Sequence, residues 1–361
     1  MLESLYWSIT WVCTRACPHC YDERFRPYPA GERERLTAAA WEVARRVVAH
    51  LPETLAYRDL EEEDGRGGFR TRPGRIVLSG GEVLLEPTRS RLLYPLLDLL
   101  RERYGAGVRL VVQTAGDLLT EAVIAELLQR GVWMISVSSI DDFHGGAGRA
   151  AGLRERLGEA FARAGVRPSA LSAERRRWVD EEGPCYSFFG ATPEAWIGKL
   201  WPSGRAWRNG LSTARWADNF CAGWSGGMHF LNLGRNGSEA AVDPEGNLYP
   251  CCRKTRLPYG NLAEEPLAAI LESLVGVPPF EAITAGVPER MGLSFGVDPD
   301  RFLELSRTVD PAAAPTTTAA SAATASTRST CRPFSPGSAW PAAGGGADER
   351  HGTQAPRAGG T

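Results

Sequence analysis

The chain has 361 residues, of which 43% are hydrophobic and 23% charged, and its formal net charge is -2. This length allows one large domain or two ordinary ones, and the composition is typical of a globular protein. The balanced charge gives no electrostatic basis for binding nucleic acid or an anionic membrane, and no apolar run approaches the roughly 20 residues of a membrane-spanning helix. Residues 1–6 lack the basic and apolar regions of a signal peptide, so we expect a cytoplasmic protein.

Residues 5–12 are rich in aromatic and β-branched side chains and are predicted to form a strand. The strand leads into a loop in which Cys13, Cys17 and Cys20 lie within eight residues. Because a cytoplasmic compartment keeps thiols reduced, such crowding indicates metal or redox chemistry rather than disulfides. A zinc site usually has four ligands, and His19 is the candidate for the fourth. Thiolates also hold iron–sulfur clusters, and three of them on a four-iron cluster would leave one iron open to an outside ligand.

Helical and strand patterns alternate along the following residues. The charged, glycine-rich residues 52–73 interrupt this alternation and are predicted to be a solvated surface insertion. Helices are predicted over 37–51, 92–104 and 153–180, and a further helix is predicted to begin after Thr120. Strands are predicted over 75–79, 108–114, 132–138 and 185–189. This alternation predicts a parallel sheet with helices outside it, and such folds place their chemistry on loops at the carboxyl ends of the strands.

One of these loops is unusually glycine-rich. The strand at 75–79 ends in Ser79 and runs directly into Gly80, Gly81 and Glu82. Two adjacent glycines after a strand allow the backbone to approach a ligand closely. A glycine pair alone is more often an ordinary turn, but its position at a strand end favours a functional role.

The spacing Cys-x3-Cys-x2-Cys, followed by Tyr21, resembles the signature of the radical S-adenosylmethionine (radical SAM) superfamily, and Gly80-Gly81-Glu82 resembles a second motif of that family. The resemblance implies a partial (β/α)6 TIM-like barrel over residues 1–215. It also implies a 4Fe-4S cluster on Cys13, Cys17 and Cys20, whose open iron is chelated by the amino and carboxylate groups of SAM.

The same resemblance implies contacts to SAM from several strand ends. In relatives, a Ser-x-Asp segment followed by a His and an Arg lies at such a position. Here the corresponding segment runs from Ser136 to His144, and Ser139 and Ile140 separate Ser138 from Asp141, so the match is imperfect. His144 could equally be a histidine of a surface loop. The residues expected to contact SAM are Tyr21, Ser79, Gly80, Gly81, Glu82, Gln113, Thr114, Ser136, Ser138 and Arg149.

The region from 221 to 271 shows a cysteine, a predicted hairpin, two cysteines, a Gly-Asn-Leu segment and a helix. This order resembles a SPASM domain or a shortened twitch domain, and the resemblance implies an auxiliary iron–sulfur cluster in a second domain at 216–300. The implied ligands are Cys221, Cys251 or Cys252, and Cys185. Gly204-Arg205-Ala206 resembles an element of relatives that carry a SPASM domain.

The end of the chain departs from that family. Complete SPASM domains continue with further cysteines, whereas residues 308–361 are rich in Ala, Pro, Thr and Gly and contain a single cysteine, Cys331. This tail has too little apolar side-chain surface to offset the conformational entropy lost on folding, and it is therefore predicted to be disordered. A shifted reading frame would also account for such a sequence.

The resemblance implies an enzyme that cleaves SAM reductively to a 5′-deoxyadenosyl radical for hydrogen abstraction. SPASM-type relatives favour an oxidoreductase or maturase that modifies a peptide or protein side chain, and a small metabolite is the alternative substrate. A non-catalytic iron–sulfur or zinc protein is the alternative from another class. The expected partners are the substrate and an electron donor such as flavodoxin or ferredoxin, with no nucleic acid and no membrane.

Overall fold

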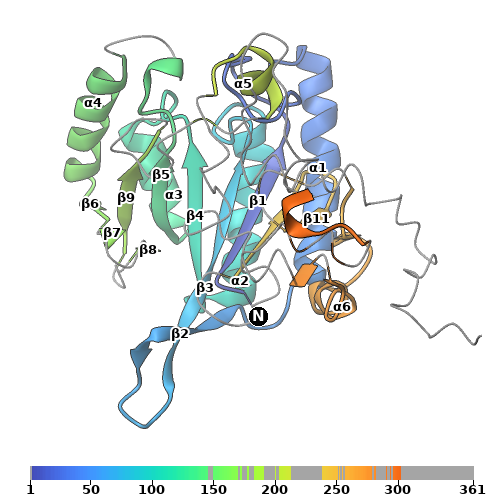
Figure 1. The fold of residues 1–361 in the computed structure, drawn as a ribbon. Helices are drawn as coiled ribbons and strands as arrows, with labels where there is room; N and C mark the ends of the chain where they lie inside the picture. The colour runs from blue at the N-terminus through green and yellow to red at the C-terminus, as the bar shows by residue number, and fades with distance from the viewer. Residues whose placement is uncertain are drawn as a thin grey trace, which may run out of the picture.

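The chain is described here from a computed structural model (Figure 1). The structure describes residues 2–144, 149–169, 171–172, 177–178, 183–190, 200, 203–212, 238–250, 252, 254, 257–278, 280–281, 290, 293 and 296–301. The predicted disordered tail, Cys221, Cys251 and Cys331 lie outside these ranges.

A ten-stranded sheet forms the centre of the described structure (Figure 1). Its strands follow the order β12-β11-β10-β1-β3-β4-β5-β9-β6, and β2 pairs with β3 beside this path. The pairs from β10 to β6 are parallel, whereas the β10–β11 and β11–β12 pairs are antiparallel. The central strands are β1 (Ser4–Thr10), β3 (Phe69–Gly80), β4 (Val108–Thr114), β5 (Val132–Val137) and β9 (Cys185–Phe188), with β6 (Arg167–Pro168) at the end. Each strand predicted from the sequence is confirmed, and with the helices outside it the sheet is a partial TIM-like barrel, as predicted.

Helices pack along one face of this sheet, where the hydrophobic core lies. They are α1 (Ala30–His50), α2 (Tyr94–Tyr104), which follows a π-helical turn η1 (Arg89–Leu93), α3 (Glu121–Gln129) and α4 (Arg149–Arg163). The predicted start of α3 is confirmed, because the Thr120 hydroxyl accepts a hydrogen bond of 3.2 Å from the Val123 amide. Helix α1 begins seven residues before the predicted start at Thr37.

The other face of the sheet surrounds a cavity, and alternation along the strands decides which side chains reach it. Successive residues of a strand point to opposite faces. On β1, Leu5, Trp7 and Ile9 are at most 1% exposed and pack in the core. Tyr6 lies between them in sequence and lines the cavity, as Val77 does on β3.

The predicted surface insertion at 52–73 is largely exposed, and it forms most of a β-hairpin, which the sequence did not predict. Strand β2 (Ala56–Glu63) pairs antiparallel with the first part of β3, and the hairpin projects from the end of the sheet at which β1 begins (Figure 1). The Arg72 guanidinium binds the Asp59 carboxylate at 2.7 Å, and the Asp59 side chain is fully buried. This strand was missed because pairing with β3 holds it, while its own sequence is charged.

The prediction of a helix over 153–180 was wrong beyond Arg163. Helix α4 ends at Arg163, and Gly165, with φ +69°, follows in the left-handed conformation that ends helices. The backbone then forms β6 and the short pair β7 (Leu171–Ser172) and β8 (Arg177–Trp178).

The predicted C-terminal hairpin is confirmed. It consists of β10 (Glu239–Val242) and β11 (Asn247–Tyr249), and β12 (Gly260–Asn261) and helix α6 (Leu267–Ser273) follow it. Strand β10 pairs in parallel with β1, with Ser4 opposite Glu239, so the hairpin extends the barrel sheet. The boundary at 215/216 between two domains stays a prediction. None of the helices in the described ranges combines the length and apolarity needed to cross a bilayer.

Candidate functional site

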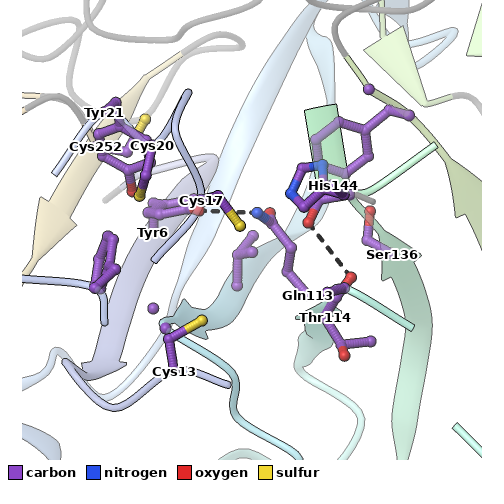
Figure 2. Close-up of a pocket in the computed structure, with 18 of the residues that line it drawn as sticks. Tyr6, Cys13, Cys17, Cys20, Tyr21, Gln113, Thr114, Ser136, His144 and Cys252 are labelled. Carbon is purple, nitrogen blue, oxygen red and sulfur yellow. Dashed lines mark hydrogen bonds between the residues drawn. The ribbon is translucent and has the colours of Figure 1, made fainter. Parts of the chain in front are cut away.

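The three cysteines of the first loop line one cavity at the carboxyl end of β1. The cavity has a volume of about 330 Å³, and Cys13, Cys17 and Cys20 are each half-buried at its wall. Figure 2 shows Cys13 and Cys17 facing the same space, with Gln113 and Thr114 across from them. The loop therefore presents its thiols to a shared interior space.

The chemistry of these thiols fits an iron–sulfur cluster. None of the three forms a disulfide. Two sulfurs on one zinc ion lie about 3.8 Å apart, given Zn–S bonds of about 2.3 Å. Among the described residues, the side chains close enough together to hold one ion are His19, Asp141 and His144, not the thiols. Thiolates are the ligands that hold iron–sulfur clusters, and three of them line this cavity.

Burial controls the protonation of the thiols and of His19 in this loop. It raises the pKa of Cys17 to about 11, with the neighbouring thiols adding to the rise, and it raises the pKa of Cys13 and Cys20 as well. The thiols are therefore protonated at neutral pH, and a metal group must displace their protons when it binds. Burial lowers the pKa of His19 to about 4, so its ring is neutral.

The Gly80-Gly81 turn packs directly against the start of the cysteine loop. The Gly81 amide donates to the Thr10 carbonyl at 2.9 Å, and the Glu82 amide donates to the Val12 carbonyl at 2.8 Å. A Cβ atom at Gly81 would overlap the Val12 carbonyl, and Gly80 adopts a φ of +134°. Both positions therefore require glycine, and both glycines line the cavity.

Glu82 is bound by the protein itself. Its carboxylate accepts hydrogen bonds from the Leu84 amide at 3.0 Å, the Thr114 hydroxyl at 2.7 Å and the Ala115 amide at 2.9 Å. The residue is 1% exposed and lies behind the cavity wall rather than on it. In this structure Glu82 ties the glycine turn to the end of β4, and its predicted contact with SAM stays a prediction.

Most of the other predicted residues lie at the cavity. The lining residues among them are Tyr21, Gln113, Thr114, Ser136 and Ser138. The Gln113 amide donates to the Tyr6 hydroxyl at 3.0 Å (Figure 2), the Ser136 hydroxyl bonds Ser187 at 2.7 Å, and the Ser138 hydroxyl donates to the Thr114 carbonyl at 3.3 Å. Ser79 lies behind the wall, with its hydroxyl 3.4 Å from the Trp7 carbonyl.

Arg149 is bound by Ser139 and Asp117, neither of which the sequence marks as its partner. Its guanidinium donates to the carbonyl and the hydroxyl of Ser139, both at 3.2 Å, and binds Asp117. Arg15 of the cysteine loop binds the same Asp117 carboxylate. Ser139-Ile140-Asp141 itself has the Ser-x-Asp spacing, so Ser139, not Ser138, is the better match.

An aspartate–histidine pair stands at the cavity beside the cysteine loop. The Asp141 carboxylate is 2.8 Å from His144 Nδ1 and accepts hydrogen bonds from the Phe143 and His144 amides. The rings of His144 and His19 are 4.3 Å apart, and both residues line the cavity. The alternative interpretation of His144 as a surface-loop histidine was wrong, because Asp141 folds its loop inward.

The cavity continues down the inner face of the barrel. Ser4 and Tyr6 of β1, Arg75 of β3 and Glu239 of β10 line it below the cysteine loop. Burial raises the pKa of Glu239 to about 8, and the Arg75 charge opposes that rise. Sequence patterns did not identify Tyr6 or Glu239, because their place at the cavity depends on strand register.

The C-terminal cysteines divide between two places. Cys252 lines the same cavity as Cys13, Cys17 and Cys20. Two residues further on, Lys254 forms an ion pair with Asp22 of the cysteine loop at 2.7 Å, and its ammonium group lies 4.2 Å from the centre of the Trp11 ring. Cys185 is fully buried against Val111 and Met134. Since Cys221 and Cys251 lie outside the described residues, the auxiliary cluster stays a prediction.

No family model and no curated protein matches the sequence. The chain is similar to the solved structure of BtrN in complex with AdoMet and 2-DOIA, with 15% identity over 83% of this chain and 92% of that chain and a TM-score of 0.40. It is similar to the structure of anSMEcpe with bound AdoMet, with 17% identity over 74% of this chain and 77% of that chain and a TM-score of 0.37. It is also similar to the structure of Streptococcus suis SuiB, with 11% identity over 79% of this chain and 68% of that chain and a TM-score of 0.37. The similarity is distant at these scores, so function has to be inferred from the site's own residues.

Gly81→Ala should lower the free energy of unfolding by on the order of 3 kcal/mol, because the new Cβ overlaps the Val12 carbonyl. Gly158→Ala is the matched control, since Gly158 lies within α4 with open space around its Cα, and it should raise stability by about 0.5–1 kcal/mol. Urea denaturation of the metal-free proteins measures both. Equal stability of Gly81→Ala and wild type would contradict the packing described for this turn.

Glu239→Gln should change how stability depends on pH. The folded-state pKa of about 8 exceeds the ordinary value of 4.5, so folding favours the protonated acid. Stability contributed by this group is present below pH 4.5 and is lost as the pH rises toward 8. Between about pH 5 and about pH 9, wild type should lose about 2–4 kcal/mol more than Glu239→Gln. Urea denaturation at both pH values checks this, and parallel losses would show that Glu239 is not desolvated.

Proposed function

We propose that the chain is a radical SAM enzyme, with a 4Fe-4S cluster on Cys13, Cys17 and Cys20 and SAM beside it. The observation that carries this proposal is the convergence of three separate sequence motifs on one cavity. The thiols, the Gly80-Gly81 backbone and the polar ends of β4 and β5 all line that cavity, at the edge of a parallel sheet where such folds place their chemistry. When bound, a reduced cluster of this kind cleaves SAM and supplies a 5′-deoxyadenosyl radical that abstracts hydrogen from the substrate.

In this proposal the chain's own residues bind and orient SAM and shield the radical from water. Tyr21, the backbone of Gly80 and Gly81, and the side chains of Gln113, Thr114, Ser136 and Ser138 are the groups available to SAM. The walls around them exclude water, which protects a reactive radical from side reactions. A proton acceptor also stands at the cavity, because Asp141 orients His144 through Nδ1 and leaves Nε2 as the atom that exchanges a proton.

For the substrate, we propose a peptide or protein side chain, which the resemblance to SPASM-type relatives supports. A small polar metabolite is a second candidate, and the cavity's extension to Tyr6 and Glu239 inside the barrel favours it. An electron donor such as flavodoxin or ferredoxin would reduce the cluster. Incubation with SAM, reductant and either peptide or metabolite libraries, with deuterium transfer into 5′-deoxyadenosine as the readout, separates the two candidates.

The anaerobically reconstituted protein should bind a 4Fe-4S cluster and, with dithionite and SAM, form 5′-deoxyadenosine. Changing Cys13, Cys17 and Cys20 together to Ala should abolish both, because the cluster loses its thiolate ligands. Cys185→Ala is the control, since that thiol is buried against Val111 and Met134, and it should retain SAM cleavage. Production of 5′-deoxyadenosine by the triple variant would rule out this loop as the cluster site.

An auxiliary cluster should appear as iron in excess of the four atoms of the first cluster. The double variant Cys221/Cys251→Ala should then keep SAM cleavage and lose the excess iron. Iron and sulfide analysis together with Mössbauer spectroscopy measures the cluster content. If wild type fully loads the first site and never exceeds four irons per chain, there is no auxiliary cluster.

A further inference from the structure

Helix α5 (Gly204–Arg208) packs on the cysteine loop, although the two segments are far apart in sequence. The amides of Arg205 and Ala206 donate to the Cys20 carbonyl at 2.8 and 3.4 Å. Gly204 has a φ of +56°, and a Cβ there would overlap the backbone carbonyl of Tyr21. The helix is thus in backbone contact with the part of the loop that carries two of the three thiols.

The Arg205 side chain binds three carbonyl oxygens of this same loop. Nε donates to Cys17 at 2.7 Å, Nη1 to Glu23 at 3.0 Å, and Nη2 to Phe25 at 2.7 Å. A guanidinium group holds its donors in one rigid plane, so three such bonds fix the relative positions of the three carbonyls. A lysine ammonium carries the same charge but lacks this planar arrangement.

The charge of Arg205 also acts on the thiols. Its guanidinium lies 2.7 Å from the Cys17 carbonyl, and its backbone amide donates to the Cys20 carbonyl at 2.8 Å, so a fixed positive charge lies beside the residues that carry two of the three thiols. A positive charge at this place would stabilise the added negative charge of a reduced cluster held by these residues, because cluster potentials depend on net charge and nearby hydrogen bonds.

We propose that Arg205 is the positioning residue of the cluster loop: it holds residues 17–25 in the shape that presents Cys17 and Cys20, and its charge raises the reduction potential of the bound cluster. This inference rests on the proposed function for its second part only. The first part concerns the loop with or without a cluster.

The test compares Arg205→Lys, Arg205→Gln and Arg208→Gln. Arg208 is the matched control, because it lies on the same helix and forms an exposed ion pair with Glu23 of the loop. Hydrogen–deuterium exchange of the metal-free proteins reports on the loop, at amides such as that of Cys20, which donates to the Cys17 carbonyl at 3.2 Å. Redox titration of the reconstituted proteins, followed by electron paramagnetic resonance, reports on the cluster.

We expect exchange in residues 17–25 to accelerate by about tenfold or more in both Arg205 variants and to stay unchanged in Arg208→Gln. The cluster potential should be more negative in Arg205→Gln than in Arg205→Lys, which keeps the charge. Unchanged loop exchange in both variants would overturn the positioning role, and so would faster exchange throughout β3 and β4, which would mean support of the whole fold. Equal potentials in all proteins would overturn the role of the charge. If wild type binds no cluster, the proposed function fails while the exchange result still decides the positioning role.

Discussion

The close approach of two backbones at the end of β1 is the constraint on which the rest of the site depends. The Gly80-Gly81 turn donates to the carbonyls of Thr10 and Val12, and no side chain fits between the two segments. This contact directs the chain that leaves β1 into the loop bearing the thiols. It also brings the glycine backbone to the cavity wall, so the same contact shapes the loop and exposes the peptide groups that a bound cofactor would meet.

The cysteine loop depends on distant segments for its shape, because side chains from those segments bind its backbone carbonyls and its charged side chains. Arg205 binds three of its carbonyls, Arg15 within it binds Asp117, and Lys254 binds Asp22 while packing over Trp11. An unsatisfied buried carbonyl costs about 1–3 kcal/mol, so the bonds from Arg205 favour one loop conformation over its alternatives, and the two ion pairs attach the loop to distant segments. The C-terminal hairpin is therefore part of the site's support, because β10 pairs with β1 and the segment after β11 reaches the loop.

The cavity inside the barrel is lined by several polar side chains among a larger apolar surface, whereas the interiors of many barrels are filled with apolar side chains. Tyr6, Gln113, Ser136 and Glu239 reach inward because alternation along each strand sends their apolar neighbours to the helices. Burying such groups costs free energy unless they are paired, and Gln113 with Tyr6 and Ser136 with Ser187 are paired. Glu239 carries the cost as a raised pKa. Polar groups that are costly to bury, set in a mostly apolar cavity, are consistent with a space shaped for a ligand that has both apolar and polar parts.

The sequence by itself determined the features that short-range patterns encode. The spacing of Cys13, Cys17 and Cys20, the strand-and-helix alternation, the N-cap at Thr120 and the hairpin around Gly246 each involve residues close together in the chain, and the structure has them as predicted. The tertiary structure alone decided that 52–73 is a hairpin, that Ser139 rather than Ser138 holds Arg149, and that Arg205 and Cys252 reach the first loop. Those outcomes depend on strand register and on contacts between residues far apart in the chain, and such contacts leave no periodic or local signal because each partner's sequence is compatible with many others.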